Sequence, residues 1–291
     1  MIAGAQSEIG AMRRVLLRHP REAWEGDARI GREWRALRYA SAPVHAAAVD
    51  EYDRFVDLLE RLGAATVFAP AGPELGLDSI YVRDAAVMSE RGAVLCSMGK
   101  AARRDEPQAL APTLDGLAIP VLGRIDGAGR LEGGDVVWLD RRTLVVGRGY
   151  RTNDDGVAQL RGLLGDTLDE LLVVPLPHHR GPDDVFHLMS ILSPVDRDLA
   201  VVYSPLMPVP LRERLLERGV ELVEVPPEEF DTLGCNVLAV APRRCVMVSG
   251  NPLTRARLER AGAEVFEFAG GEICAKGAGG PTCLTRPLER G

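Results

Sequence analysis

The feature that most constrains the fold is a stretch of sequence that recurs along the chain: an amphipathic helical segment ends at a glycine, and a short apolar segment follows. Clear copies surround Gly63, Gly219 and Gly262, and two weaker copies surround Gly116 and Gly165. Glycine often ends a helix because it adopts left-handed backbone conformations without strain. Successive glycines lie 53, 49, 54 and 43 residues apart. Self-similarity at roughly 20–50 residues is typical of a propeller or an array of repeats.

Each repeat also has room for strands before its helix. These apolar stretches cover residues 13–18, 86–96, 143–147, 199–203 and 237–248. Strands combined with a helix in each repeat favour α/β blades around an axis over an all-β propeller. A doubly wound sheet also alternates strands and helices, but no GxGxxG phosphate turn follows a strand here. The sequence therefore predicts an α/β ring of five repeats.

Length and composition limit the classes of protein. A chain of 291 residues can hold one large core or two small ones. No interdomain linker divides it, so we expect one domain made of five repeats over residues 1–291. The 46% hydrophobic and 26% charged residues are typical of a globular protein. A net charge of -7 argues against a nucleic-acid surface, and no basic tract is present for anionic lipids.

The sequence shows no recognisable targeting signal, and this and the cysteine spacing favour a cytoplasmic protein. Residues 1–17 hold no apolar core before a cleavage site, and no later stretch approaches 18 uninterrupted apolar residues. The cysteines are odd in number and form no CxxC pair, which argues against disulfides and a structural zinc site. They are Cys96, Cys235, Cys245, Cys274 and Cys283.

One connection is much longer than the others. Residues 18–43 separate the first predicted strand from the first helix and carry Trp24, Trp34 and Tyr39 among several arginines. Loops of this length are usually functional or disordered. The aromatic residues favour a lid over a linker.

Polar residues bunch with glycine or apolar neighbours at four places: residues 78–84, 131–135, 186–189 and 279–283. In the last of these, Cys283 follows a glycine-rich run that leaves open space around its thiol. A substrate could reach such a thiol, so Cys283 is a candidate nucleophile. A free cysteine is also often a small buried apolar residue, and local sequence alone leaves both interpretations open.

Three further residues are candidates only as a group. His187 sits in an apolar stretch where a hydrogen-bonded core histidine is the common case, and Glu132 and Asp84 could each be a solvated charge at a turn. A five-fold ring, however, can bring several strand ends toward one axis, where these groups and a thiol would share a pocket. His178 and His179 are adjacent and point to opposite sides of an extended chain, so we do not expect a zinc site.

These motifs resemble the guanidino-group-modifying enzymes of the pentein fold, which include dimethylarginine dimethylaminohydrolases, arginine deiminases and amidinotransferases. The resemblance runs in the same order from Val15 to Cys283. It implies a five-bladed, pseudo-symmetric propeller of ββαβ-like units with a central active site. The segment from Asp78 to Asp84 looks most like the DSxxVxD motif of the bacterial dimethylarginine hydrolases.

The resemblance also implies roles for individual residues. Cys283 and His187 correspond to the catalytic pair, and Glu132 to the glutamate beside the histidine. Asp84 and Asp78 correspond to residues that bind the substrate, Asp84 through the guanidinium. The first member of the Arg103-Arg104 pair and Arg151 of the Arg-Thr-Asn segment correspond to contacts with the substrate carboxylate. No metal or organic cofactor is implied, and a homodimer is a family expectation.

Two residues depart from the family patterns. Met189 stands where deiminases have an aspartate that clamps an unsubstituted guanidinium, which leaves apolar room suited to an alkylated one. Arg83 stands where bacterial dimethylarginine hydrolases tend to have glutamate, and here the chain is similar to deiminases and amidinotransferases.

The expected reaction is attack by the Cys283 thiolate on the guanidinium carbon, protonation of the departing amine by His187, and hydrolysis of a covalent thiouronium. Dimethylarginine or methylarginine would give citrulline and an amine. Arginine deimination and amidino transfer are the rivals, in that order. A non-catalytic pentein-fold binding protein and a Cys/His protease are weaker alternatives.

Overall fold

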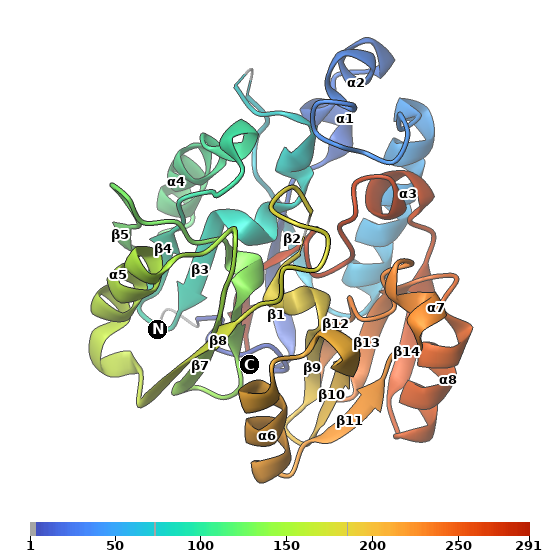
Figure 1. Cartoon of the computed structure of the whole chain (residues 1–291). Coiled ribbons are helices and arrows are strands. Elements are labelled where there is room, and N and C mark those ends of the chain that lie inside the picture. Colours follow the sequence, from blue (N-terminus) through green and yellow to red (C-terminus); the bar gives the residue numbers. More distant parts are fainter. Residues whose placement is uncertain (1–3, 73, 185) are drawn as a thin grey trace.

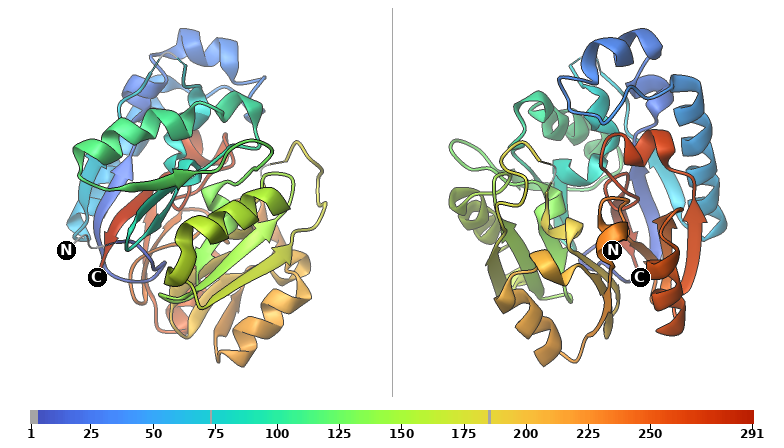
Figure 2. Two further views of the ribbon diagram at one scale, coloured as in Figure 1. Left: turned by 90° about the vertical axis from the view of Figure 1, so that its left-hand side faces the viewer. Right: turned by 45° about the vertical axis from the view of Figure 1, so that its right-hand side comes forward.

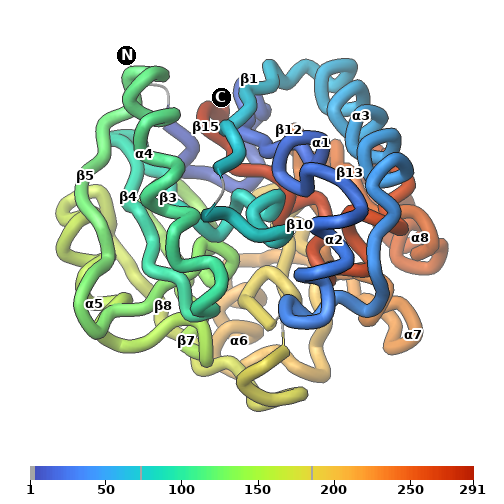
Figure 3. Tube along the Cα trace, turned by 90° about the horizontal axis from the view of Figure 1, so that it is seen from above, coloured from blue at the N-terminus to red at the C-terminus, as the bar shows by residue number. Residues whose placement is uncertain are grey.

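The computed structural model describes residues 4–72, 74–184 and 186–291. Five three-stranded sheets stand as blades around a common axis, with a helix on the outer side of each (Figures 1 and 3). The fold is the predicted five-bladed α/β arrangement. The strands are β1 (Met12–Leu17), β2 (Ala65–Phe68), β3 (Ala86–Ser89), β4 (Gly92–Leu95), β5 (Val121–Arg124), β6 (Val136–Trp138), β7 (Thr143–Arg148), β8 (Glu170–Pro175), β9 (Leu192–Asp196), β10 (Leu199–Val202), β11 (Glu221–Glu224), β12 (Leu238–Ala241), β13 (Arg244–Val248), β14 (Glu264–Phe268) and β15 (Arg286–Arg290).

All five blades have the same internal pairing. The middle strand pairs antiparallel with the first strand and parallel with the third, which follows a helix. The blade helices are α3 (His45–Arg61), α4 (Glu106–Gly116), α5 (Asp154–Leu164), α6 (Val209–Glu217) and α8 (Pro252–Arg260). Each blade is therefore a ββαβ unit, as the family resemblance implies.

The two ends of the chain share one blade. Strand β15 pairs antiparallel with β1, placing Pro287 opposite Val15, and β2 pairs with β1 on its other side. Ala11 and Gly291 also exchange two backbone hydrogen bonds of 2.9 Å. Figure 2 shows the ends of the chain next to each other in both views. The last strand thus completes the first blade and closes the ring.

Four of the five predicted glycines end their helices in left-handed backbone conformations, with φ from +54° at Gly165 to +98° at Gly63. Gly116 differs, because it is still the last residue of α4. The chain turns slightly later, and Ala118 takes the left-handed conformation with φ +56°.

The buried apolar side chains form five clusters, and each cluster combines residues from two neighbouring blades. One joins Leu16 on β1 and Leu288 on β15 to Ala86 on β3. Another joins Val195 on β9 to Met247 on β13. The contacts between blades are therefore hydrophobic all around the ring.

The long connection of residues 18–43 is folded against the body of the protein. It contains α1 (Pro20–Ala23) and α2 (Asp27–Glu33), at the top of Figure 1. Trp24 is fully buried, and its indole N–H donates to the carbonyl of Leu77 at 2.9 Å. Tyr39 is also buried. The segment is a packed wall in this state, and its closure as a lid stays a prediction.

Candidate active site

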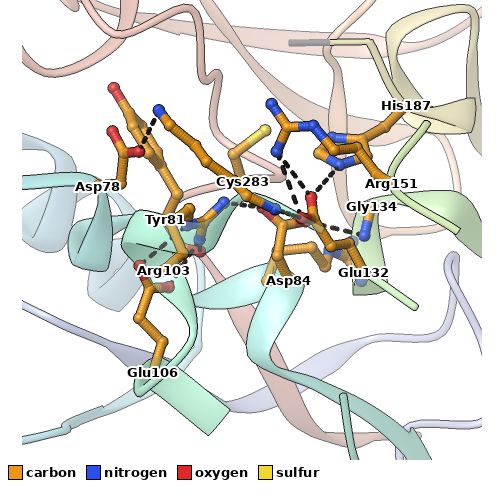
Figure 4. A network of polar contacts seen from close by, with 12 residues as sticks. Asp78, Tyr81, Asp84, Arg103, Glu106, Glu132, Gly134, Arg151, His187 and Cys283 are labelled. Atoms are coloured by element: carbon orange, nitrogen blue, oxygen red, sulfur yellow. Dashed lines mark hydrogen bonds and ion pairs between the residues drawn. The ribbon is translucent and has the colours of Figure 1, made fainter. Parts of the chain in front are cut away.

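Four predicted site residues occupy equivalent places, in the segment just before the first strand of a blade. Asp84 precedes β3, Glu132 precedes β6, His187 precedes β9 and Cys283 precedes β15. First strands of neighbouring blades contact each other, as β9 does β12 and β15 does β3. The segments before them therefore converge on the axis, and Figure 4 shows the four side chains gathered there.

Glu132 and His187 form a buried pair. The carboxylate Oε2 lies 2.6 Å from the imidazole Nε2 and 3.1 Å from Nη1 of Arg151. The other oxygen accepts the backbone N–H of Gly99 at 2.8 Å. Burial alone would raise the pKa of Glu132, but the hydrogen bond from His187 and the charge of Arg151 outweigh it and hold this pKa well below its usual range. Glu132 is therefore a fixed negative charge.

The imidazole of His187 is in an unusually anionic environment. Burial alone would lower its pKa, but the carboxylates of Asp84, Asp135 and Glu132 outweigh burial and raise the pKa to about 9. At neutral pH His187 therefore carries a proton that it can give to a leaving group.

Asp84 belongs to a second buried network. Its Oδ2 lies 2.6 Å from Nη1 of Arg103, and its Oδ1 accepts the backbone N–H of Gly134 at 2.9 Å. Arg103 also binds both oxygens of Glu106, at 2.8 and 2.9 Å, and the carbonyl of Tyr81 at 2.9 Å. One hydrogen on Nη1 of Arg103 is the donor left over from these contacts.

Asp78 pairs with a lysine that the sequence did not single out. Nζ of Lys100 lies 2.5 Å from Asp78 Oδ2 and donates to the carbonyl of Leu37 at 2.9 Å. The wall formed by residues 18–43 is thereby tied to the site. Asp78 lies at the outer part of the network in Figure 4.

Cys283 ends a tightly packed loop. Its Sγ lies 3.4 Å from Nδ2 of Asn236, and the amide oxygen of Asn236 accepts the N–H and the hydroxyl of Thr282 at 3.0 and 2.8 Å. A Cβ on Gly280 would lie 2.5 Å from the Asn236 side chain, so only glycine allows this approach. Burial raises the pKa of the Cys283 thiol.

A cavity of about 340 Å³ joins these groups. Six of the seven predicted site residues line it, and the seventh, Glu132, lies behind His187 and Arg151. The lining residues are Asp78, Tyr81, Asp84, Lys100, Arg103, Arg151, His187, Gly277, Ala278, Gly279 and Cys283. The structure thus brings all the predicted site residues together.

Sequence reasoning missed Asn236 and Lys100. Asn236 stands just before β12, the place that Glu132, His187 and Cys283 take in other blades. That equivalence was a usable signal. Lys100 had no comparable signal, because a lysine after a glycine in a loop is a common surface residue.

Metal-ligand atoms of Asp84, Glu132 and His187 lie within 4.8 Å of one another. Both carboxylates, however, are already neutralised by the guanidinium groups of Arg103 and Arg151. A divalent metal would need a neutral imidazole and carboxylate oxygens free of these ion pairs, and the raised pKa of His187 favours the protonated ring instead. This environment suits binding of a guanidinium better than binding of a divalent metal.

Comparisons with known proteins agree with this geometry. The family model described as "N,N dimethylarginine dimethylhydrolase, eukaryotic" matches residues 30–290. The protein YkgA of Bacillus subtilis is 27% identical over 286 residues, covering 98% of this chain and 95% of YkgA. An arginine deiminase of Rhodococcus erythropolis is 31% identical over 192 residues, covering 55% of this chain but only 46% of the deiminase.

Solved structures share the fold. A dimethylarginine dimethylaminohydrolase of Pseudomonas aeruginosa superposes with a TM-score of 0.77 at 22% identity, covering 97% of this chain and all of the other. An amidinotransferase of Microseira wollei gives a TM-score of 0.74 at 14% identity, covering 100% of this chain and 98% of the other. No helix among the described residues is long and apolar enough to cross a membrane.

The fold and the convergent Cys, His and carboxylate groups place the protein among the guanidino-group-modifying enzymes of the pentein superfamily. Within that class, the match over residues 30–290 shows that the chain belongs to the N,N-dimethylarginine dimethylhydrolase family. It is a hydrolase that cleaves carbon–nitrogen bonds of linear amidines.

Proposed function

We propose that the protein hydrolyses Nω-methylated arginines, with Nω,Nω-dimethylarginine first, to citrulline and the corresponding amine. The observation that carries this proposal is the single cavity in which Cys283 and the protonated His187 face the anionic Asp84, with the charge of Glu132 directly behind. A thiol, a proton donor and an anionic cradle are the groups that guanidinium hydrolysis needs.

The substrate guanidinium would bind to Asp84, and the negative charge of Glu132 would attract it from behind His187. Asp84 lines the cavity and accepts one hydrogen bond from Arg103 and one from the backbone N–H of Gly134, so lone pairs of its carboxylate remain for the N–H groups of a guanidinium. Arg103 and Arg151 form ion pairs with Asp84 and Glu132, and we assign both arginines contacts with the substrate carboxylate as well. For Arg103, this contact would use the remaining hydrogen on Nη1. Asp78 would act together with Lys100 at the amino-acid end of the substrate.

Catalysis would begin when the substrate lowers the pKa of Cys283. Burial raises this pKa, and a cationic guanidinium beside the sulfur would favour the thiolate. The thiolate then attacks the guanidinium carbon, and His187 gives its proton to the departing amine. Water, deprotonated by the now neutral His187, attacks the thiouronium carbon and releases citrulline and the thiol.

The preference for a methylated substrate rests on Met189. This side chain is buried beside the site, where a carboxylate would be needed to clamp an unsubstituted guanidinium. Structures of the fold relatives include a cysteine-to-serine variant with citrulline and a histidine-to-glycine variant as an adduct with S-methyl-L-thiocitrulline. Arginine deimination is the second candidate, because arginine deiminases are 31–33% identical over a matched region of 192 residues.

The test combines a colorimetric assay for ureido product with intact-protein mass spectrometry, using arginine, Nω-methylarginine, Nω,Nω-dimethylarginine and agmatine. We expect ureido product and a covalent adduct from the methylated arginines, and neither from Cys283→Ser. Faster turnover of arginine than of dimethylarginine would identify a deiminase instead. Faster loss of substrate on addition of glycine, with transfer of the amidino group to it, would identify an amidinotransferase.

A further inference from the structure

A second and larger cavity opens on the other side of Cys283. Its volume is about 930 Å³, against about 340 Å³ for the first. The two cavities share only His187, Ala278 and Cys283 among their described lining residues. The reacting thiol and the proton donor therefore stand between two compartments, and the first compartment alone holds the charged residues assigned to the amino-acid end.

Apolar side chains form much of the wall of the second cavity, although the buried side chains of Arg83 and Asn236 also line it. Phe186, Met189, Phe230 and Leu233 line it, together with Cys235. Phe230 is fixed by stacking on Tyr203, with ring centroids 4.0 Å apart.

The charges at the opening of the second cavity are mostly paired with each other. Arg180 binds both carboxylate oxygens of Asp231 at 2.7 and 2.8 Å, and both side chains are more than half exposed. The compartment therefore combines apolar walls with an exposed polar rim.

The position of Cys283 fixes which part of a substrate enters each compartment. If the amino-acid end lies among Lys100, Arg103 and Arg151, the guanidinium carbon sits at the thiol and its outer nitrogen points toward the second cavity. His187 lines both compartments, so it can protonate a nitrogen at this boundary. The departing amine and its substituents would therefore lie in the apolar compartment.

The size of this compartment exceeds what two methyl groups need. The second cavity is much larger than the first. Two methyl groups would leave most of its apolar wall without contacts. A longer or aromatic substituent would bury that wall, at about 25 cal/mol per Å² of apolar surface.

We propose that the second cavity is a subsite for an apolar substituent larger than methyl on the departing nitrogen, so that bulky Nω-alkyl and Nω-aralkyl arginines are substrates. This inference rests on the proposed function. The bond between the guanidinium carbon and the substituted nitrogen breaks, His187 supplies the proton to the amine, and water supplies the oxygen of citrulline. Nω-Benzylarginine and water thus give citrulline and benzylamine.

The experiment measures kcat/KM for Nω,Nω-dimethylarginine, Nω-propylarginine and Nω-benzylarginine, with citrulline, amine and ammonia determined separately. We expect kcat/KM for the benzyl compound to equal or exceed that for dimethylarginine, with one benzylamine released per citrulline. Release of ammonia with Nω-benzylcitrulline would overturn the inference, because the substituent would then lie away from the second cavity.

Two substitutions at Leu233 test whether the subsite lies in the second cavity. Leu233→Trp narrows the second cavity and should lower the ratio of kcat/KM for benzylarginine to that for dimethylarginine at least tenfold, whereas Leu233→Ala should raise it. Leu216→Trp on the exposed face of α6 is the control and should leave the ratio unchanged. An unchanged ratio in both Leu233 variants would overturn the assignment of the subsite.

The two proposals can fail separately. One outcome is that dimethylarginine is hydrolysed while kcat/KM for the propyl and benzyl compounds is less than one hundredth of the dimethylarginine value. That result would overturn the subsite and leave the proposed function standing. Absence of ureido product from every arginine derivative, with folded protein, would overturn the proposed function and the subsite with it.

Discussion

At the scale of single residues, the His187–Glu132 and His19–Asp53 pairs differ mainly in burial. His187 and Glu132 are both buried and lie 2.6 Å apart, whereas Asp53, 3.0 Å from His19, has a side chain 49% exposed. Charges in a dry site interact more strongly than charges in contact with water. We therefore expect the His187–Glu132 pair to affect the reaction rate strongly and the His19–Asp53 pair to affect it little.

This contrast gives the first prediction. Glu132→Gln keeps the shape of the side chain but removes one of the carboxylates that raise the pKa of His187, so this pKa should fall below about 9. We expect kcat/KM to fall at least about 100-fold, within the range of a general acid–base contribution. Asp53→Asn is the matched control and should change stability by less than about 1 kcal/mol. NMR titration of the imidazole checks the shift, and an unchanged pKa in Glu132→Gln would contradict it.

The second prediction concerns pH. The pKa of His187 is about 9 in the folded protein, against about 6.5 in an unfolded chain. The folded state therefore binds the proton more tightly, and the resulting stability is fully present below pH 6.5 and lost as pH rises through about 9. The loss should be on the order of 3 kcal/mol.

Urea unfolding at pH 6 and pH 10 measures this contribution of His187 to the unfolding free energy. The difference in unfolding free energy between wild type and His187→Gln should shrink as pH rises, since the variant lacks the titrating group. A difference that is the same at both pH values would show that His187 is not protonated in the folded protein.

At the scale of elements, the loop before β15 holds its shape through close contacts with Asn236. Gly280→Ala would place a Cβ 2.5 Å from the Asn236 side chain, which must then move away from Cys283. We expect at least about a tenfold loss of kcat/KM, as displacement of a positioned group by 1 Å can lower a rate about 100-fold. Gly162→Ala in α5 is the control, because nothing lies within 4 Å of its Cβ. It should retain full activity and gain up to about 1 kcal/mol of stability. Equal activity of both variants would contradict this role of the loop.

The sequence predicts best those helices and strands that form because of their own local residue pattern, without depending on contacts with distant segments. Helices ending at Gly63 and Gly219 are visible because amphipathic pattern and helix stop coincide locally. Strand β15 was not predicted, since Arg286 to Arg290 shows no apolar run and becomes a strand only through pairing with β1. Asn236 was missed for a similar reason: its role depends on Cys283, far along the sequence but 3.4 Å away in space.

At the scale of the whole molecule, the ring is closed by short strands and by hydrophobic clusters between blades. Among the residues that the structure describes, every hydrophobic cluster includes side chains from two blades. A blade therefore cannot bury its apolar face without its neighbours, which is the usual reason that single repeats are unstable. We propose on this basis that residues 1–291 unfold as one catalytic domain, and that the strand that closes the ring controls the stability of all five blades.

The final prediction tests this proposal at Leu288. This side chain is 1% exposed on β15 and packs in the cluster between the first and second blades. Leu288→Ala should lower the unfolding free energy by about 2–5 kcal/mol, the usual result of deleting a buried leucine side chain. Leu216→Ala, 48% exposed on α6, should change it by no more than about 0.5 kcal/mol. Because each blade depends on the next, tryptophan fluorescence and enzyme activity should be lost together in one urea transition, shifted to lower urea in Leu288→Ala. Two separate transitions in wild type would mean that the blades form more than one independently folding unit.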